Sequence, residues 1–344
     1  MTASYKKYIL KFKRPSGTSR GVLTEKETWF LKISDGNNFG IGECGILRSL
    51  SYDDRPDYEE KLKWVCNNIN MGAEMLWEEL REFPSIQFGV EMAFKSLKAE
   101  TPFLLFPSEF TSGKKAIPIN GLIWMGDKQF MKEQISEKIE QGFNCIKLKI
   151  GAIDFETELD LLKAIRSNFS EDEIELRVDA NGAFSPQDAL KKLDLLSRLK
   201  LHSIEQPIRQ GQIEEMTILC KKTPLPIALD EELIGLTNVT EKENLIQTIA
   251  PQYAIFKPSL IGGFKGTNEW IKACDKKGVK WWITSALESN IGLNAISQFT
   301  FTLDSDLPQG LGTGSLYTNN FESPLEVKNG QIQYNPAREW EIKI

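Results

Sequence analysis

The stretch CIKLK at residues 145–149 is a short apolar run that carries two lysines at alternate positions. Charged residues then recur along the chain at Asp179, Glu205, Asp230 and Lys257. Their spacing, roughly 25 to 30 residues, is the length of one strand-plus-helix unit of an α/β barrel. Each is therefore predicted to lie at the C-terminal end of a strand, where the side chains of successive strands converge on one active site.

Short β-rich runs alternate with amphipathic helical segments around these residues. Eight candidate strands follow one another, which is the number that a closed parallel barrel needs. They are expected at residues 117–122, 145–149, 175–179, 202–205, 226–230, 253–257, 280–284 and near 309–312.

The chain of 344 residues is long for one hydrophobic core, so two units are expected. β-rich segments followed by helical ones predict an α+β capping domain at residues 1–115. Residues 116–315 are predicted to form a catalytic (β/α) barrel, and residues 316–344 to return to the cap. The predicted fold class is α/β: a TIM-type barrel with an N-terminal α+β capping domain completed by the C-terminal segment.

The composition argues against several classes of binding partner. A net charge of −6 argues against a nucleic-acid or anionic-membrane surface, and the absence of a run of about 18 apolar residues argues against a spanning helix. The five cysteines are odd in number and form no Cys-x-x-Cys pair, which favours a reducing cytoplasm. The expected partner is a small molecule, and no feature sets the oligomeric state.

Three acids at neighbouring strand ends would repel one another by about 4 kcal/mol per pair at 4 Å and an effective dielectric of 20. Such a cluster needs a dication. Because Asp179, Glu205 and Asp230 offer only oxygen ligands, they predict a Mg²⁺ site in which Mn²⁺ can substitute. Any one of these acids by itself would more often be a surface or helix-capping residue, so the prediction rests on all three.

The two lysines of the strand expected at residues 145–149 differ by two positions, so Lys147 and Lys149 point to the same side. Crowding and burial are expected to lower a lysine pKa, which suits a general base. Lys257 would approach from the opposite side of the barrel. This set indicates proton abstraction next to a carboxylate, with the metal and Lys147 stabilising the dianionic enolate.

Two other features are interpreted as structural. Residues 40–45, GIGECG, match G-x-G-x-x-G, but a poor helix follows and no βαβ unit surrounds them, so a dinucleotide site is rejected. The single histidine, His202, is expected to pack at a strand start. Because it is the one histidine in the sequence and is expected to be structural, a mechanism that needs a histidine base is disfavoured.

With these motifs the chain resembles the enolase superfamily, specifically the branch similar to muconate-lactonising enzymes. The resemblance covers nearly the whole chain and includes the cap's glycine-rich strand at residues 40–43. Within the branch the chain is most similar to the o-succinylbenzoate synthase family, on the evidence of KPSLIGG at 257–263, TSALES at 284–289, GLGTG at 310–314 and the cap loop TSRG at 18–21.

The resemblance implies a hydro-lyase of menaquinone biosynthesis, which dehydrates 2-succinyl-6-hydroxy-2,4-cyclohexadiene-1-carboxylate to 2-succinylbenzoate. It implies that Lys149 takes the proton α to the carboxylate and that Lys257 lies over the ring as a cation. It places Glu231 behind the metal ligands. The substrate contacts that it implies are Arg20, Arg177, Asn181, Ser285, Gly312, Thr313 and Gly314; a salt bridge inside the barrel is an equal alternative for Arg177.

Other activities stay open. Dipeptide epimerases of the same branch carry an Asp-x-Asp on strand eight that binds the substrate ammonium, and N-succinylamino acid racemases are also similar. Here Asp304-Ser305-Asp306 is expected in the loop that enters strand eight, which weakens the epimerase alternative. A barrel that binds metal and ligand without catalysis is a third alternative, disfavoured by the Lys149 and Lys257 pair.

Overall fold

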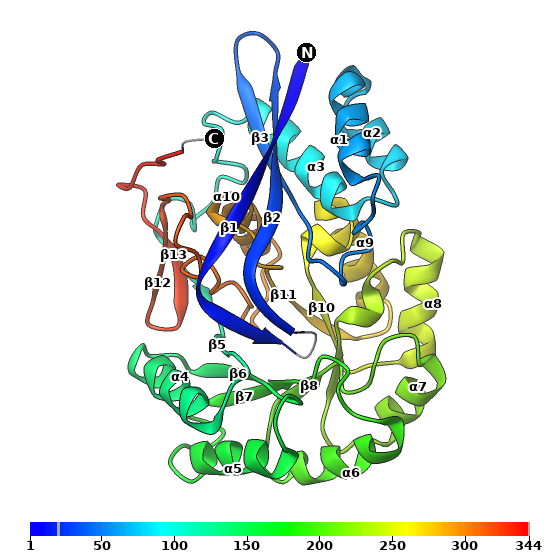
Figure 1. The fold of residues 1–344 in the computed structure, drawn as a ribbon, viewed down its shortest axis with the longest axis vertical. Helices are drawn as coiled ribbons and strands as arrows, with labels where there is room; N and C mark the ends of the chain where they lie inside the picture. The colour runs from blue at the N-terminus through cyan, green and yellow to red at the C-terminus, as the bar shows by residue number, and fades with distance from the viewer. Residues whose placement is uncertain (19–20, 343–344) are drawn as a thin grey trace.

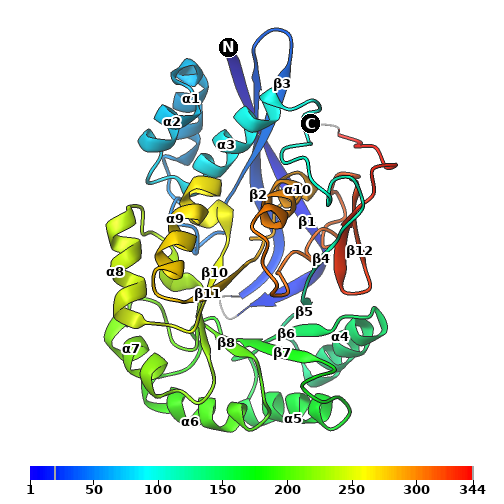
Figure 2. The ribbon, with the colours of Figure 1, turned by 180° about the vertical axis from the view of Figure 1, so that it is seen from behind.

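The computed structural model describes residues 1–18 and 21–342. An antiparallel sheet with helices packed beside it forms one end of the molecule (Figure 1). A curled parallel sheet with helices around its outside forms the other end. The chain makes the antiparallel part first and the parallel part second, as Figure 2 shows from behind.

The N-terminal part contains one three-stranded sheet in the order β1-β2-β3. A short 3₁₀ helix, η1, lies between the first two helices of this part. Its elements are β1 (Thr2–Thr18), β2 (Gly21–Ser34), β3 (Phe39–Gly45), α1 (Tyr58–Asn67), η1 (Ile69–Met71), α2 (Ala73–Glu79) and α3 (Pro84–Lys98).

The glycine motif of β3 serves close packing. A Cβ atom on Gly42 would lie 1.8 Å from the Gly89 carbonyl oxygen of α3, and one on Gly40 would lie 2.1 Å from the Ala93 carbonyl oxygen. A Cβ on Gly89 would in turn meet Cys44 Sγ at 2.1 Å. Only glycine allows strand and helix backbones to approach this closely, which explains a motif that is otherwise typical of nucleotide binding.

The second part contains seven parallel strands in the order β5 to β11, joined by helices that cover the outside. The strands are β5 (Gly121–Ile123), β6 (Cys145–Lys149), β7 (Glu175–Asp179), β8 (Ser203–Glu205), β9 (Ile227–Leu229), β10 (Tyr253–Phe256) and β11 (Lys280–Ile283). The helices are α4 (Lys128–Glu140), α5 (Phe155–Arg166), α6 (Pro186–Ser197), α7 (Ile213–Lys222), η2 (Glu231–Leu233), α8 (Val239–Ile249), η3 (Pro258–Leu260), α9 (Gly263–Asp275) and α10 (Asn290–Thr302).

Gln309 and Gly310 close the ring at the place of the eighth strand. Gly310 N donates to the Ile283 carbonyl at 2.8 Å, and Asn120 N donates to the Gln309 carbonyl at 2.9 Å. The pair therefore bridges the last strand, β11, to the segment just before the first, β5. Eighth-strand pairing at this point agrees with the strand expected near residues 309–312.

The first barrel strand differs from the range 117–122 expected for it. Ile117 and Pro118 form β4, which pairs with β13 (Gln331–Tyr334) and not with β6. The hairpin of β12 (Leu325–Lys328) and β13 competes for the same backbone groups, and Ile119 N donates to the Gly330 carbonyl at 2.9 Å. The barrel strand proper therefore begins at Gly121.

Segments distant in sequence also join the two parts. Lys13 N donates to the Leu316 carbonyl at 2.8 Å, and Gly17 bridges to Met125. The long β1 strand thus crosses the mouth of the barrel from the exit of strand eight to the exit of strand one (Figure 1). Near the C-terminus, the Trp340 ring stacks on Phe103 with centroids 4.4 Å apart. The domain limits at residues 115 and 315 stay a prediction.

None of the helices in the described ranges 1–18 and 21–342 is long and apolar enough to cross a membrane. All five cysteines are free thiols.

Replacing Gly42 with alanine should destabilise the protein, because the new Cβ would overlap the Gly89 carbonyl and push β3 away from α3. Overpacking of this kind costs about 1–3 kcal/mol, which urea denaturation can measure. Gly121→Ala is the matched control, since its Cβ would meet only the flexible side chain of Lys138. Equal stability of the two variants would contradict the close-packing explanation.

Candidate active site

The strand register brings the predicted charged residues to one level. Lys149 of β6 pairs with Asp179 of β7, and Asp179 pairs with Glu205 of β8. Asp230 follows β9 directly, and Lys257 follows β10. All five therefore lie at the C-terminal ends of neighbouring strands, where the sequence spacing predicted them.

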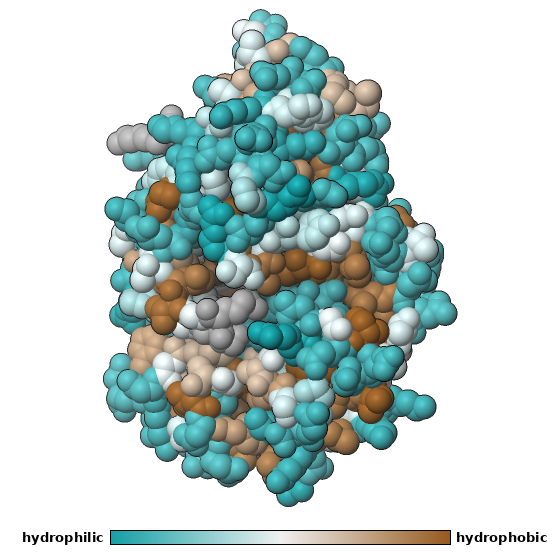
Figure 3. Space-filling view, turned by 45° about the vertical axis from the view of Figure 1, so that its right-hand side comes forward, coloured by the Kyte–Doolittle hydropathy of each residue, from teal (hydrophilic) through white to brown (hydrophobic). Residues whose placement is uncertain are grey.

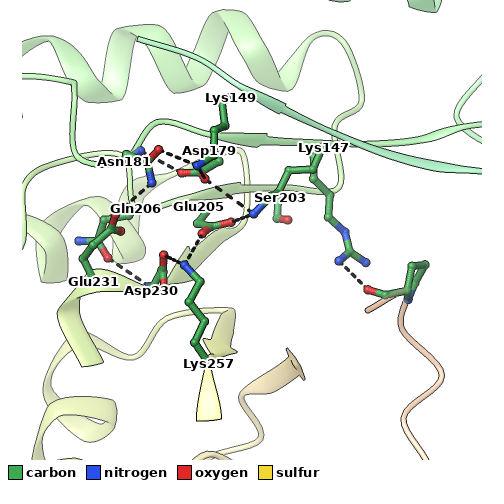
Figure 4. Close-up of polar contacts among 12 residues, drawn as sticks. Lys147, Lys149, Asp179, Asn181, Ser203, Glu205, Gln206, Asp230, Glu231 and Lys257 are labelled. Atoms are coloured by element: carbon green, nitrogen blue, oxygen red, sulfur yellow. Dashed lines mark hydrogen bonds and ion pairs between the residues drawn. The ribbon is translucent and has the colours of Figure 1, made fainter. Parts of the chain in front are cut away.

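Lysines and acids alternate along these strand ends in one continuous row. Lys149 Nζ lies 2.7 Å from Asp179 Oδ2, and Lys147 Nζ lies 3.7 Å from that oxygen and 2.6 Å from Glu205 Oε2. Lys257 Nζ pairs with Asp230 Oδ2 and lies 3.7 Å from Glu205 Oε1. Figure 4 shows Lys149 and Lys257 approaching the acids from opposite sides.

The three carboxylates are only 1–2% exposed, so their charges depend on these neighbours. Burial by itself would raise the pKa of Asp179, but Lys149 and Lys147 outweigh burial and hold this pKa well below its usual range. Lys147 and Lys257 likewise lower the pKa of Glu205 against burial and the charge of Asp179. For Asp230 burial prevails over Lys257, and with help from Glu231 and Glu205 it raises the pKa well above the usual range.

The expected depression of a lysine pKa is wrong for Lys147. Burial lowers it, but the Glu205 and Asp179 carboxylates more than compensate, and the pKa of Lys147 is raised. The expected depression rested only on burial and the neighbouring lysine, whereas the acids of the next two strands have the larger effect on this pKa.

An amide connects Lys149 to a further acid. Asn181 Oδ1 accepts a hydrogen bond from Lys149 Nζ at 2.8 Å, and Asn181 Nδ2 donates to Glu231 Oε1 at 3.0 Å. Asn181 N also donates to Asp179 Oδ1 at 3.0 Å, from a backbone with φ of 43° that asparagine tolerates. Glu231 is thus connected to Lys149 and Asp179 through hydrogen bonds of Asn181.

Gln206 supports the turn at Asp230, although it was not among the predicted site residues. Its Oε1 accepts hydrogen bonds from Asp230 N at 3.2 Å and Glu232 N at 3.3 Å. The amide therefore fixes the turn that carries the third acid. Its position directly after Glu205 is the only signal in the sequence.

A cavity opens above the row, between barrel and cap. Lys147, Lys149, Asp179, Asn181 and Lys257 form its floor. Much of the remaining wall is apolar, and hydrophobic side chains are gathered in the hollow between the two parts of the molecule (Figure 3). The apolar wall comes from both parts: Val22, Leu23, Leu47, Leu50, Leu122, Trp124, Ala286 and Leu287.

Several of these wall residues were not predicted, because nothing local marks Leu23, Leu50 or Trp124 as facing a ligand. They meet only when the cap folds over the barrel. The Lys149 ammonium lies 5.9 Å from the centroid of the Trp124 ring.

Some of the predicted substrate contacts line the cavity and others do not. Ser285, Gly312 and Thr313 line the cavity, and the hydroxyls of Ser285 and Thr313 lie 2.6 Å apart. Gly314 lies behind this wall, where its carbonyl accepts from Asn320 Nδ2 at 2.8 Å and a Cβ would meet Asn290 Oδ1 at 2.7 Å. Arg20 lies outside the described residues.

Arg177 points away from the cavity. Its Nε lies 2.6 Å from Glu175 Oε1, its Nη1 donates to the Pro308 carbonyl at 2.9 Å, and its guanidinium lies over the ring of Trp282. Glu175 begins β7 and Pro308 precedes strand eight, so this cluster sits at the opposite end of the barrel. The structure therefore disagrees with a substrate contact for Arg177 and places it in the salt bridge named as the alternative.

His202 belongs to the same distant end. Its ring centroid lies 4.7 Å from that of Tyr253. Burial, reinforced by Arg177, lowers the pKa of His202 to about 4. It packs at a strand start, as expected.

The fit of this site to a metal ion can be judged from its oxygens. In the described part of the chain, no three carboxyl groups already meet around one point as metal ligands would, because lysine nitrogens lie between them. The acids nevertheless form a contiguous oxygen-only set, and Glu205 Oε1 is buried without a hydrogen bond from any described residue. Such a donor set suits a hard dication.

Comparisons with known proteins agree with this geometry. The family model for enolase C-terminal domain-like proteins matches residues 130–338. The chain is 45% identical to an o-succinylbenzoate synthase of Desulfotalea psychrophila, over 96% of this chain and 98% of that protein. The chain belongs to the o-succinylbenzoate synthase family of the enolase superfamily. The resemblance stated from the sequence is thereby confirmed.

Solved structures confirm the fold class. The crystal structure of MenC from Desulfotalea psychrophila is similar with a TM-score of 0.86 and 42% identity, covering 97% of this chain and 99% of that one. A dipeptide epimerase of Enterococcus faecalis, complexed with Mg and the dipeptide L-Leu-L-Tyr, is similar with a TM-score of 0.84, covering 97% and 96%. At 17% identity the epimerase shares the fold alone.

Proposed function

We propose that this chain is an o-succinylbenzoate synthase, a Mg²⁺-dependent lyase that dehydrates 2-succinyl-6-hydroxy-2,4-cyclohexadiene-1-carboxylate to 2-succinylbenzoate in menaquinone biosynthesis. The observation that carries the proposal is the pair of Lys149 and Lys257 on opposite sides of a row of three buried acids, at the floor of a largely apolar cavity, in a member of this family. A ring with a carboxylate suits such a cavity, because the floor is charged and the wall is apolar.

Lys149 is the general base. Its Nζ has two acceptors within 2.8 Å, Asp179 Oδ2 and Asn181 Oδ1, and the side chain also lines the cavity. A neutral amine has two N–H groups and one lone pair, so donating both hydrogens to these acceptors turns the lone pair toward the cavity. There it takes the proton α to the ring carboxylate.

Lys257 and Lys147 are cations beside the three acids Asp179, Glu205 and Asp230. Their positive charges stabilise the negative charge that grows on the substrate as the proton leaves. The ammonium formed on Lys149 then returns its proton to the departing hydroxyl, the carbon–oxygen bond breaks, and water is released. Loss of water makes the ring aromatic, so the first proton transfer is the step that most needs stabilisation.

Asp179, Glu205 and Asp230 would hold Mg²⁺, with Glu231 and Asn181 supporting them, and Mn²⁺ should substitute because it accepts the same oxygen ligands. When bound, the dication supplies positive charge beside the substrate carboxylate.

The other end of the substrate would meet the opposite wall. The Ser285 and Thr313 hydroxyls and the backbone at Gly312 line the cavity there and offer hydrogen bonds to a second carboxylate. Asn181 lies on the cavity floor and is proposed as a further substrate contact. Arg20 of the cap loop is proposed as a substrate contact on the resemblance alone.

A dipeptide epimerase is disfavoured by the position of Asp304-Ser305-Asp306. Both aspartates are exposed, and the loop precedes Gln309, so it lies at the N-terminal end of strand eight and away from the cavity. A non-catalytic barrel is disfavoured because a binder does not need two lysines facing each other across the acids.

We place the reaction in the cytoplasm, which accords with five free thiols.

Removal of the metal should abolish turnover. We expect EDTA to inactivate the enzyme and Mg²⁺ or Mn²⁺ to restore it, because the acids cannot supply positive charge beside the substrate. Asp230→Asn should weaken Mg²⁺ binding by at least about tenfold, since it removes one ligand charge. Titration calorimetry with Mg²⁺ measures the binding, and full turnover after chelation would contradict the metal assignment.

Loss of the base should stop the reaction while the site persists. Lys149→Ala should reduce kcat by roughly 10²–10⁴, the usual contribution of a general base, and Lys257→Ala should also be severely impaired. Circular dichroism and Mg²⁺ titration check that fold and metal site remain. Lys163→Ala, an exposed lysine on α5, is the control. A near-parental kcat for Lys149→Ala would exclude it as the base.

Replacing Asp304 and Asp306 together with asparagine tests the epimerase alternative. An ammonium site would lose charge-assisted hydrogen bonds of about 1.5–3 kcal/mol each, whereas exposed loop changes usually cost less than about 0.5 kcal/mol. We expect unchanged dehydration by the double variant and no deuterium uptake into Ala-Glu by the parent in D₂O. Deuterium exchange that the double variant abolishes would favour an epimerase.

A further inference from the structure

Three charged side chains are buried between the cap and the barrel, outside the cavity wall. They are Lys26 of β2, Glu43 of β3 and Glu288 just before α10, and they are between 0% and 4% exposed. Burying charges costs free energy unless partners compensate for it. Their contacts therefore indicate what the cluster is for.

Glu43 reaches from the cap to the first turn of a barrel helix. Its Oε1 accepts a hydrogen bond from Ser289 N at 2.9 Å, and its Oε2 accepts from Ser289 Oγ at 2.5 Å and from Gly292 N at 2.8 Å. Thr28 Oγ1 of the cap donates to Oε1 at 3.0 Å. The carboxylate thus satisfies backbone N–H groups at the positive N-terminus of α10.

The first turn of α10 is shaped to admit this carboxylate. A Cβ atom on Gly292 would lie 2.8 Å from Glu43 Oε2 and 2.8 Å from Glu288 Cβ. Glycine therefore leaves the room in which the cap acid sits, and any larger residue would displace it.

The same turn is joined to the cavity wall. Ser285, Ala286 and Leu287 line the cavity and lead directly into Glu288 and Ser289. Glu288 Oε2 accepts from Ala286 N at 2.8 Å, which closes this short segment on itself. Leu287 has a φ of 62°, a strained value for leucine, so the segment holds a conformation that its surroundings impose.

Glu288 also connects the wall to the segment after Lys257. Its Oε1 accepts from Ser259 Oγ at 2.5 Å. Burial raises the pKa of Glu288, and the positive charge of Lys26 in the cap opposes that rise. Among the described residues Lys26 Nζ has no hydrogen-bond partner, so its role here is electrostatic.

We propose that Glu43 is a positioning residue for substrate binding: from the cap it fixes the N-terminus of α10 and, through Ser289, sets the Ser285–Leu287 wall that meets the substrate. The inference rests on the proposed function, since that wall is assigned to the substrate's second carboxylate. It predicts that Glu43 acts on affinity and not on proton transfer, because Lys149 and Lys257 lie elsewhere.

Glu43→Gln keeps the shape of the side chain but leaves one N–H donor of α10 facing an amide N–H. We expect KM to rise by about tenfold or more, with kcat at saturation within about threefold of the parent. Calorimetric affinity for 2-succinylbenzoate with Mg²⁺ should fall by a similar factor. Gly292→Ala should act in the same direction although Glu43 is intact, because it displaces the carboxylate.

Glu91→Gln is the matched control. Glu91 is also a cap acid at a barrel helix, since its Oε2 accepts from Phe264 N at 2.6 Å and its Oε1 from Lys265 N at 3.1 Å at the start of α9. That turn does not line the cavity. Glu91→Gln should therefore lower stability in urea as Glu43→Gln does, while leaving KM and product affinity unchanged.

The outcomes separate the possibilities. An unchanged KM in Glu43→Gln, or an equal rise in Glu91→Gln, would overturn the proposal in favour of mere domain docking. Should Glu43→Gln not fold, Thr28→Val removes the 3.0 Å donor to Glu43, together with a 3.3 Å contact to the Cys44 carbonyl. It should show a smaller rise in KM, and the absence of that rise would also overturn the proposal. A parent that neither dehydrates the cyclohexadiene nor binds 2-succinylbenzoate would instead refute the proposed function.

Discussion

The alternating row of lysines and carboxylates at the strand ends is the constraint on which the site depends. Asp179, Glu205 and Asp230 are almost fully buried, and each has a lysine nitrogen against it. Removing one member of a buried ion pair leaves an uncompensated charge, which costs about 3–5 kcal/mol. The strand register that aligns Lys149, Asp179 and Glu205 is therefore tied to the charge balance, and a shift of one residue would turn these side chains out of the barrel.

The cap completes what the barrel begins. The barrel supplies the charged floor, and the cap supplies apolar wall residues such as Val22, Leu23 and Leu50. β1 can cross the barrel mouth because Gly17 has no side chain: a Cβ there would lie 2.5 Å from the Met125 carbonyl oxygen. Backbone contact across the mouth and buried charge between the two parts of the molecule together shape the cavity.

The sequence predicted the strands and their charged ends well, because both depend on local periodicity. The spacing of Asp179, Glu205 and Asp230 placed all three correctly at the C-terminal ends of neighbouring strands. The errors concern what local patterns do not contain. Arg177 and Asp179 share a face of β7, but period two gives the face and not the depth, and Arg177 turns to the other end. Lys147 was misjudged because its pKa depends on acids of other strands.

The two ends of the barrel show why position relative to a strand matters more than residue type. Glu175, Arg177 and His202 form a charged, aromatic-lined cluster at the N-terminal ends, with the same residue classes as an active site. The Pro308 carbonyl and the Trp282 ring close that cluster, so its charged groups contact other protein groups and do not face a cavity. The C-terminal ends instead open into a cavity, where Lys149 has both its partners and a free approach. The same holds for Asp304 and Asp306: they precede the strand-eight pairing at Gln309 and Gly310, so they lie at the N-terminal ends of the strands and not at the cavity.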